Sequence, residues 1–263
     1  MISNDLNISL IQTSLFWEDK KSNLDSFEKK IQRITSSQPD IVVLPEMFST
    51  GFTMNSASLA ETNSGETMQR VVSWSKKYDI AIFGSFIASE NGNFYNRGFA
   101  ALPNSQIFFY DKRHLFSMSG ENNIFSPGKT NTIVSYKGWN IALSICYDLR
   151  FPIWLRNKQN EYDILLVMAN WPESRKDAFN ILLKARAIEN ACYVCGCNRI
   201  GKDKDGLNYS GNSQIINYKG NIIAKCEENS DEIITTTLRK EELSLFREKF
   251  PVWKDADSFS IID

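Results

Sequence analysis

The chain has 263 residues, of which 42% are hydrophobic and 12% aromatic, so it can bury a substantial core and is not of the disordered class. Thirty Lys and Arg residues against 31 Asp and Glu residues give a formal net charge of -1, which argues against nucleic acid or anionic lipid as a partner. The longest apolar stretch near the middle, Ile164–Ala169, is far shorter than the ~20 residues of a membrane helix. Because the N-terminus lacks a secretory signal pattern and five Cys residues make no disulfide framework, we expect a cytoplasmic protein.

The first half of the chain begins with two short apolar runs on either side of an amphipathic stretch. Apolar residues recur at helical spacing through Lys20–Ser36, which predicts a helix that covers a sheet. The flanking runs are too short for helices and predict buried strands, so the chain starts as a β-α-β unit. A second helix and a strand meander follow. The expected elements are the helix Met68–Tyr78 and the strands Ile8–Ile11, Ile41–Leu44, Ile80–Ala88, Tyr95–Leu102 and Gln106–Tyr110.

The second half repeats this pattern and predicts further helices. One is expected to begin near Pro152, where the missing N–H costs nothing, and another spans Asp177–Asn190. Many strands with few helices favour two sheets packed together, and hence a four-layer α-β-β-α sandwich in a single domain, residues 1–263. The expected strands are Thr132–Tyr136, Trp139–Ile145, Ile164–Ala169, Ala191–Cys197, Ser213–Asn217, Ile222–Cys226 and Glu232–Leu238.

Cys146 lies where a predicted strand ends and a turn begins. A thiol there faces the carboxyl edge of a sheet, close to free backbone N–H groups that favour a thiolate. This position indicates a nucleophile, although a buried cysteine that acts as a small apolar residue is the commoner case. A cysteine nucleophile also needs a base. His114 is the one histidine of the chain, so a cysteine hydrolase built on His114 stays open as an alternative.

Two charged residues occupy positions equivalent to that of Cys146. Glu46 follows the run Ile41–Leu44, and Lys112 follows the strand that ends at Tyr110. Each residue alone is typical of a solvated loop. Because strand ends meet at one edge of an α/β sheet, where ligand sites gather, the three residues together predict an active site.

The motifs around these residues resemble those of the nitrilase (carbon-nitrogen hydrolase) superfamily. They are LPEMF around Glu46, YDKRHLF around Lys112 and CYDLRFP around Cys146, and the similarity continues through ANWPESR, ARAIEN, GCNR, YSGNSQ and FPVWKDAD. Within the superfamily the set is most similar to the ω-amidase, or 2-oxoglutaramate amidase, branch. One departure is Ile153, because many relatives carry an acidic residue just after the Phe-Pro of the cysteine motif.

The resemblance implies a hydrolase of linear amides that needs no metal or cofactor. It implies that Glu46 is the general base, Cys146 the nucleophile and Lys112 the group that stabilises the oxyanion, with the backbone N–H of Tyr147. It also implies that Glu121 is a supporting acid that orients Lys112 or the substrate. A plain loop carboxylate is the alternative for Glu121.

The resemblance further implies a small substrate with a distal carboxylate, and hence a cation in the pocket. Arg150, Arg175 and Arg186 are the candidates, since a guanidinium binds a carboxylate through two parallel hydrogen bonds. The spacing of Arg186 and Glu189 on one helix favours instead an ion pair between them. The side chains expected to form an apolar wall are Phe48, Phe116, Met118 and Trp171.

The cysteines in Cys192–Cys197 invite a metal-site interpretation. Zinc needs four ligands, and a strand through these residues would point Cys192 and Cys195 to opposite faces. We therefore expect a strand and no metal.

The sequence thus predicts a cytoplasmic ω-amidase that converts 2-oxoglutaramate or succinamate to the dicarboxylate and ammonia. The alternatives are the same chemistry on an N-carbamoyl amide or a nitrile, and a non-catalytic binding protein. The resemblance also implies a homo-oligomer, a dimer or larger, with the C-terminal segment 239–263 packing at the interface.

Overall fold

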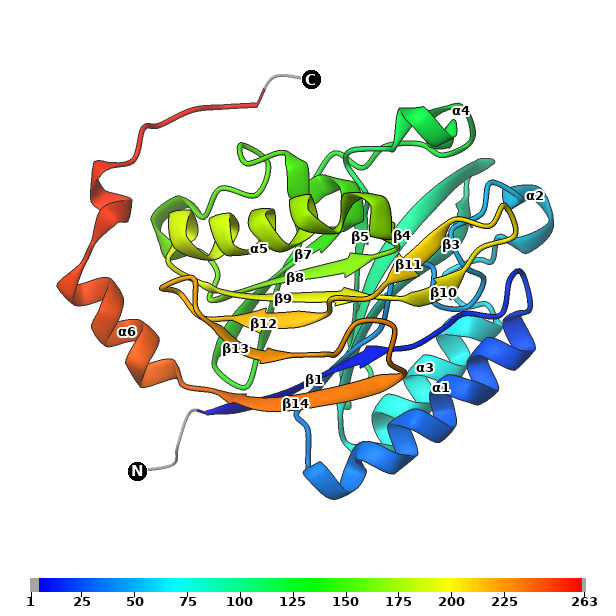
Figure 1. Cartoon of the computed structure of the whole chain (residues 1–263), viewed down its shortest axis with the longest axis horizontal. Helices are drawn as coiled ribbons and strands as arrows, with labels where there is room; N and C mark the ends of the chain where they lie inside the picture. Colours follow the sequence, from blue (N-terminus) through cyan, green and yellow to red (C-terminus); the bar gives the residue numbers. More distant parts are fainter. Residues whose placement is uncertain (1–4, 262–263) are drawn as a thin grey trace.

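Two six-stranded sheets pack face to face in the computed structural model, which describes residues 5–261 (Figure 1). The first sheet has the strand order β14-β1-β2-β3-β4-β5, and the second has the order β13-β12-β9-β8-β7-β6. The strands of the first sheet are β1 (Leu6–Gln12), β2 (Ile41–Val43), β3 (Ala81–Glu90), β4 (Asn93–Ala101), β5 (Ile107–Asp111) and β14 (Glu232–Leu238). Those of the second sheet are β6 (Ile133–Tyr136), β7 (Trp139–Ile145), β8 (Ile164–Ala169), β9 (Tyr193–Asn198), β12 (Gln214–Ile216) and β13 (Ile222–Lys225).

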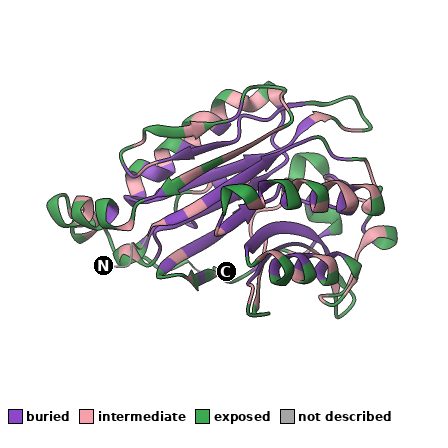
Figure 2. Ribbon diagram, turned by 90° about the horizontal axis from the view of Figure 1, so that it is seen from below, coloured by how far each residue is buried: buried purple, intermediate pink, exposed green. Residues whose placement is uncertain are grey.

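Helices cover the outer faces of both sheets. The first sheet is covered by α1 (Lys20–Ile34) and α3 (Glu66–Tyr78), and the second by α5 (Lys176–Asn190) (Figure 1). In Figure 2 the buried strands lie between helices whose outward residues are exposed. The predicted four-layer α-β-β-α sandwich is therefore confirmed. The smaller helices are α2 (Ser56–Leu59), α4 (Glu121–Ile124) and α6 (Lys240–Lys249). In the described part of the chain, no helix is long and apolar enough to cross a membrane.

The alternation of side chains along the strands explains the layers. On β2, Ile41 and Val43 belong to the core cluster between the sheets, whereas Val42 packs in the cluster beneath α1 and α3. Every residue of β8 is buried because the second sheet has the first sheet on one side and α5 on the other. Cys197 joins the two sheets, since its thiol lies 3.3 Å from the Val43 carbonyl and 3.4 Å from that of Ile11.

Strand direction brings several carboxyl ends to the same edge. The strand β2 is parallel to β1 and β3, as the β-α-β start predicts, and β3, β4 and β5 form the expected antiparallel meander. In the second sheet β7, β8 and β9 are parallel. The loops that follow β2, β5, β7 and β8 carry the residues of the site described below.

The prediction of a helix beginning near Pro152 is wrong. A short 3₁₀ helix, Cys146–Arg150, comes directly after β7, and the chain then forms turns. Phe151 has φ -112° and ψ 88°, outside the helical region, because a following proline disfavours helical backbone. The short hairpin β10 (Ile200–Lys202) and β11 (Asn208–Ser210) and the helix α6 were not predicted.

Candidate active site

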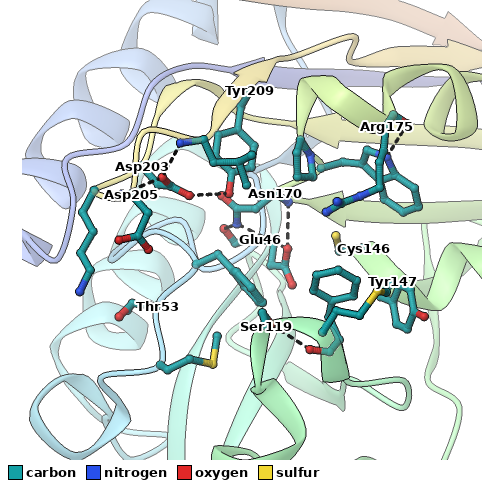
Figure 3. A pocket seen from close by; sticks show the side chains of 18 of the residues that line it. Glu46, Thr53, Ser119, Cys146, Tyr147, Asn170, Arg175, Asp203, Asp205 and Tyr209 are labelled. Atoms are coloured by element: carbon teal, nitrogen blue, oxygen red, sulfur yellow. Dashed lines mark hydrogen bonds between the residues drawn. The ribbon is translucent and has the colours of Figure 1, made fainter.

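Glu46, Lys112 and Cys146 line one cavity of about 460 Å³. Figure 3 shows Glu46 and Cys146 among the side chains of this cavity. Lys112 directly follows β5 and Cys146 directly follows β7, so the two sheets contribute to the same site. The cavity is within the size range of small-molecule pockets. The structure thus brings together three side chains that are 66 and 34 positions apart in the chain.

Lys112 is buried between two carboxylates. Its Nζ lies 2.9 Å from Glu46 Oε1, and 3.0 and 2.9 Å from the two carboxylate oxygens of Glu121. All three side chains are fully or almost fully buried. Glu121 and Glu46 together raise the pKa of Lys112 against the opposing effect of burial, so the amine is an ammonium at neutral pH.

The two carboxylates differ in how many donors they already bind. Glu121 accepts four hydrogen bonds, from Asn96, twice from Lys112, and from the Phe116 backbone N–H at 2.6 Å. These fill its acceptor sites. Glu46 accepts two at Oε1, whereas its Oε2 accepts one short bond, 2.8 Å from the Asn170 backbone N–H, and a long contact of 3.5 Å. Glu46 therefore keeps a free lone pair, and Glu121 does not.

Glu46 and Cys146 interact electrostatically in the cavity that both of them line. The Asn170 backbone N–H that bonds Glu46 Oε2 also interacts with the Cys146 thiol, so both groups meet at one peptide. Burial and then Glu46 raise the pKa of Cys146 well above its usual range, and Lys112 and Asn170 oppose them. These effects favour the neutral thiol over the thiolate in the resting site.

The backbone at two of these positions is in the left-handed region. Cys146 has φ 45° and Met47, the residue after Glu46, has φ 44°. Non-glycine residues adopt this conformation rarely and at an energetic cost, and such residues cluster at active sites. Here the conformation turns the chain sharply at the end of β7.

Five of the side chains expected to bind substrate line the cavity. They are Tyr147, Arg150, Trp171, Phe116 and Met118. The prediction for Phe48 is wrong, because its fully buried ring packs against Phe27 and Phe99 in the core beneath α1 and α3. The turn at Met47 separates Phe48 from Glu46 and directs its side chain into the core.

Two of the three candidate arginines line the cavity, and the third does not. Arg150 and Arg175 line the cavity, with their guanidinium carbons 4.9 Å from the ring of Trp171 and 5.2 Å from that of Phe116, respectively. Within residues 5–261, neither forms an ion pair with a carboxylate. Arg186 is buried elsewhere and binds Glu189 and the Leu149 carbonyl, as its helical spacing favoured. Its role is structural.

His114 does not line the cavity. Its ring stacks on Phe151 with a centroid separation of 3.7 Å, and its Nδ1 lies 2.9 Å from Asp148 Oδ1. Asp148 also accepts hydrogen bonds from the Tyr110 hydroxyl and the Ile145 N–H. The alternative of a cysteine hydrolase built on His114 is therefore wrong, because this ring lies outside the cavity and packs against the turn after β7.

Three parts of the site were missed by the sequence reasoning. Asn96 bridges the two carboxylates, Asn170 binds Glu46, and the tip of the β10–β11 hairpin adds Asp203 and Asp205 to the cavity lining. Figure 3 draws Asp203 and Asp205 across the cavity from Cys146 and Arg175. Asn170 follows β8 as Cys146 follows β7, so its place at a strand end was a usable signal.

The cysteine cluster has the strand conformation that was expected. Cys195 and Cys197 lie on β9, and both are fully buried, as is Cys192. In residues 5–261 the structure groups no three His, Cys, Asp or Glu side chains as metal ligands.

The model of the family "Carbon-nitrogen hydrolase" matches residues 7–248. The chain belongs to this family. Omega-amidase YafV of Yersinia enterocolitica is 42% identical over 259 residues, which are 98% of this chain and 99% of that protein. The 2-oxoglutaramate amidase of Bacillus subtilis is 31% identical over 252 residues, 94% and 96% of the two chains. The predictions of a nitrilase-superfamily chain and of an amide-cleaving hydrolase are therefore confirmed.

Solved structures agree with this membership of the carbon-nitrogen hydrolase family. XC1258 of Xanthomonas campestris, a CN-hydrolase superfamily protein with an arsenic adduct in its active site, has a TM-score of 0.95 and 36% identity, with coverage of 98% and 99%. Saccharomyces cerevisiae Nit3, a member of branch 10 of the nitrilase superfamily, has a TM-score of 0.85 and 23% identity, with coverage of 94% and 95%. The sandwich is thus of the nitrilase type.

Proposed function

We propose that this carbon-nitrogen hydrolase is an ω-amidase. It hydrolyses the terminal amide of a small amide with a distal carboxylate, such as 2-oxoglutaramate or succinamate, to the acid and ammonia. The observation that carries the proposal is one cavity that holds a carboxylate, a buried ammonium, a thiol and two arginines without ion pairs among the described residues. The names of the Yersinia and Bacillus relatives support the same substrate class.

In the proposed mechanism Glu46 is the general base and Cys146 the nucleophile. Glu46 Oε2 takes the thiol proton as the sulfur attacks the amide carbon. The proton then passes to the leaving nitrogen, ammonia departs, and a thioester remains. Glu46 next takes a proton from water, whose oxygen attacks the thioester. The acid leaves, and the proton returns to the sulfur of Cys146.

Lys112 and the Tyr147 backbone N–H hold the negative oxygen that forms in each attack. Lys112 Nζ donates to Glu46 Oε1 and to both oxygens of Glu121, and in the proposed mechanism one of these hydrogens turns to the substrate oxygen as charge develops there. Glu121 acts as a fixed anion that aims Lys112 and takes no proton itself. Loss of one oxyanion donor costs ~100 to 1,000-fold in rate.

Arg150 and Arg175 bind the distal carboxylate of the substrate. Each guanidinium is held over an aromatic ring, which fixes its plane while leaving its N–H groups for the ligand. The apolar surfaces of Phe116, Trp171 and Met118 limit the length of the substrate.

Ammonia release across a panel of substrates tests this proposal. The panel contains 2-oxoglutaramate, succinamate, the neutral amide butyramide, an N-carbamoyl amino acid and a simple nitrile. We expect the two carboxylate-bearing amides to be hydrolysed fastest, and Arg150→Ala and Arg175→Ala to lower kcat/KM for succinamate by ~10 to 100-fold with little change for butyramide. Preference for the carbamoyl compound or the nitrile would replace the proposed substrate class.

We propose that the protein is cytoplasmic and a homo-oligomer. The outer face of α5 exposes Ile181 and Ile188, which are 65% and 57% accessible, and Phe250, just after α6, is 59% accessible. We take these exposed apolar side chains as part of the interface between subunits. The segment 239–263, as far as it is described, runs along the outside of the sandwich (Figure 1) and is the second part of the proposed interface.

A further inference from the structure

The buried side chain of Asn96 bridges the two carboxylates of the site. Its Nδ2 donates to Glu46 Oε1 at 2.8 Å and to Glu121 Oε1 at 3.1 Å. Asn96 lies on β4 and is fully buried. One amide nitrogen thus places one hydrogen on each carboxylate, and the mechanism described above gives it no role.

The orientation of the Asn96 amide is fixed by its neighbours. The Met47 backbone N–H donates to Ser85 Oγ at 2.8 Å, so the hydroxyl hydrogen of Ser85 is free to donate to Asn96 Oδ1, 3.1 Å away. A flipped amide would set its oxygen against two carboxylates that have no hydrogen to give. The nitrogen of Asn96 therefore faces Glu46 and Glu121.

Asn96 also holds Lys112 through its backbone. The Lys112 N–H donates to the Asn96 carbonyl at 3.0 Å, where the chain leaves β5. The residue therefore contacts Glu46, Glu121 and Lys112, and it does not line the cavity.

We propose that Asn96 is a positioning residue of this enzyme: its amide holds Glu46 and Glu121 as anions around Lys112, so that Glu46 is aimed and ready to take the thiol proton. The inference rests on the proposed function in one respect, namely that Glu46 is the base.

The charges of the site explain why such a donor is needed. The titratable groups that face one another here are Glu46, Glu121, Lys112 and Cys146. Two carboxylates share one ammonium in a buried space, and burial, with Glu46 adding to it, raises the pKa of Glu121, while Lys112 lowers it. A neutral amide that donates to both carboxylates stabilises their ionised forms without adding a charge. Without it, protonation of the pair starts at higher pH and removes the base.

The test is the pH profile of Asn96→Ala, measured on the ω-amide and on p-nitrophenyl acetate. This ester has a good leaving group and no carboxylate. The rate at which it acylates Cys146 therefore depends on the general base and not on the proposed substrate specificity. We expect kcat on the amide to fall ~10 to 100-fold with KM changed less than about threefold. We also expect the acid limb of kcat/KM to move up by about one pH unit on both substrates.

Two further variants separate positioning from a loss of stability. Ser85→Ala keeps the amide of Asn96 but removes the hydroxyl that orients it, so the acid limb should move in the same direction by a smaller amount. Asn157→Ala removes another buried amide, which bonds the carbonyls of Tyr162 and Asn190 outside the cavity. It should lower the melting temperature and leave the pH profile unchanged.

An acid limb that stays at the wild-type pH in both Asn96→Ala and Ser85→Ala overturns the proposal. If Asn96→Ala does not fold, the limb of Ser85→Ala decides alone. If the wild-type enzyme is acylated by the ester but does not hydrolyse ω-amides, the proposed substrate class is wrong. The pH profile of the ester reaction then tests the role of Asn96. An ester reaction that survives Cys146→Ala removes both proposals.

Discussion

In the proposed mechanism the reaction starts from the Glu46 carboxylate and a neutral Cys146 thiol. Because burial and Glu46 raise the pKa of Cys146 well above its usual range, we expect the proton to leave the sulfur only as the sulfur attacks. This differs from an ion pair formed in advance, in which the thiol pKa is lowered. The neighbouring ammonium of Lys112 lowers the pKa of Cys146, but by less than burial and Glu46 raise it.

The ultraviolet absorbance of thiolate tests this protonation state. The difference between the wild-type protein and Cys146→Ala should show no thiolate from about pH 6 to about pH 8. The other four cysteines are buried and cancel in the difference. A thiolate signal with its midpoint below about pH 7 would contradict the neutral resting thiol.

His114 gives a second test at the scale of one side chain. Because its ring lies outside the cavity and pairs with Asp148, His114→Gln should keep kcat within about threefold and lower the free energy of unfolding by ~1 kcal/mol. Ammonia release and urea denaturation measure the two quantities. A variant that folds normally but loses ~1,000-fold in kcat would return His114 to the mechanism.

Residues at strand ends could be predicted from the sequence, and residues within strands could not. Glu46, Lys112 and Cys146 each follow an apolar run, so a common edge was a reasonable expectation. Asn96 lies inside β4, where the sequence shows only a polar residue in a strand. Its role depends on β3 and β4 pairing so that Ser85 reaches it, which is a tertiary property.

At the scale of elements, the β10–β11 hairpin forms the wall of the cavity that carries acidic side chains. The Tyr209 ring lies 4.7 Å from the guanidinium carbon of the buried Arg199, and its hydroxyl lies 3.1 Å from Asp203 Oδ2. Asp203 Oδ1 in turn accepts the N–H groups of Asp205 and Leu207. The Tyr209 hydroxyl thus adds a side-chain hydrogen bond to the backbone bonds that pair β10 with β11.

Removing that hydroxyl should weaken substrate binding more than catalysis. We expect Tyr209→Phe to raise KM ~3 to 10-fold and to change kcat less than about twofold, because the ring stays in place while the Asp203 carboxylate loses one of its hydrogen bonds. Tyr218→Phe is the matched control, since Tyr218 is buried but does not line the cavity. Equal kinetics in Tyr209→Phe and the control would show that the hairpin tip does not touch the substrate.

The missed hairpin and the misplaced helix have different causes. A strand such as β8 is apolar throughout, so its limits follow from the sequence alone. The stretch between Gly201 and Gly206 is charged and indicates a loop, yet it closes a hairpin through Asp203. The helix expected near Pro152 fails because the same proline restricts the residue before it. Local patterns indicate buried elements well and exposed ones poorly.

At the scale of the whole molecule, α5 exposes two isoleucine side chains on its outer side. Ile181 and Ile188 are seven residues apart and so share one side of the helix. In the proposed oligomer this side is buried against another subunit.

Light scattering coupled to gel filtration tests the proposed interface. Ile188→Glu should shift the mass toward that of one 30.1 kDa chain, because a buried charge without a partner disrupts an apolar interface. Ile133→Glu on the edge strand β6 is the control and should keep the wild-type mass. A monomeric wild-type protein, or an unchanged mass in Ile188→Glu, would contradict the interface.

We propose that the two sheets bring Glu46, Lys112 and Cys146 together to cleave an amide through a thioester. Mass spectrometry of the protein quenched with acid during turnover of succinamate tests this most directly. We expect an added succinyl group on the peptide that contains Cys146, with neither the adduct nor ammonia release in a folded Cys146→Ala variant. Ammonia release at the wild-type rate by Cys146→Ala would contradict it.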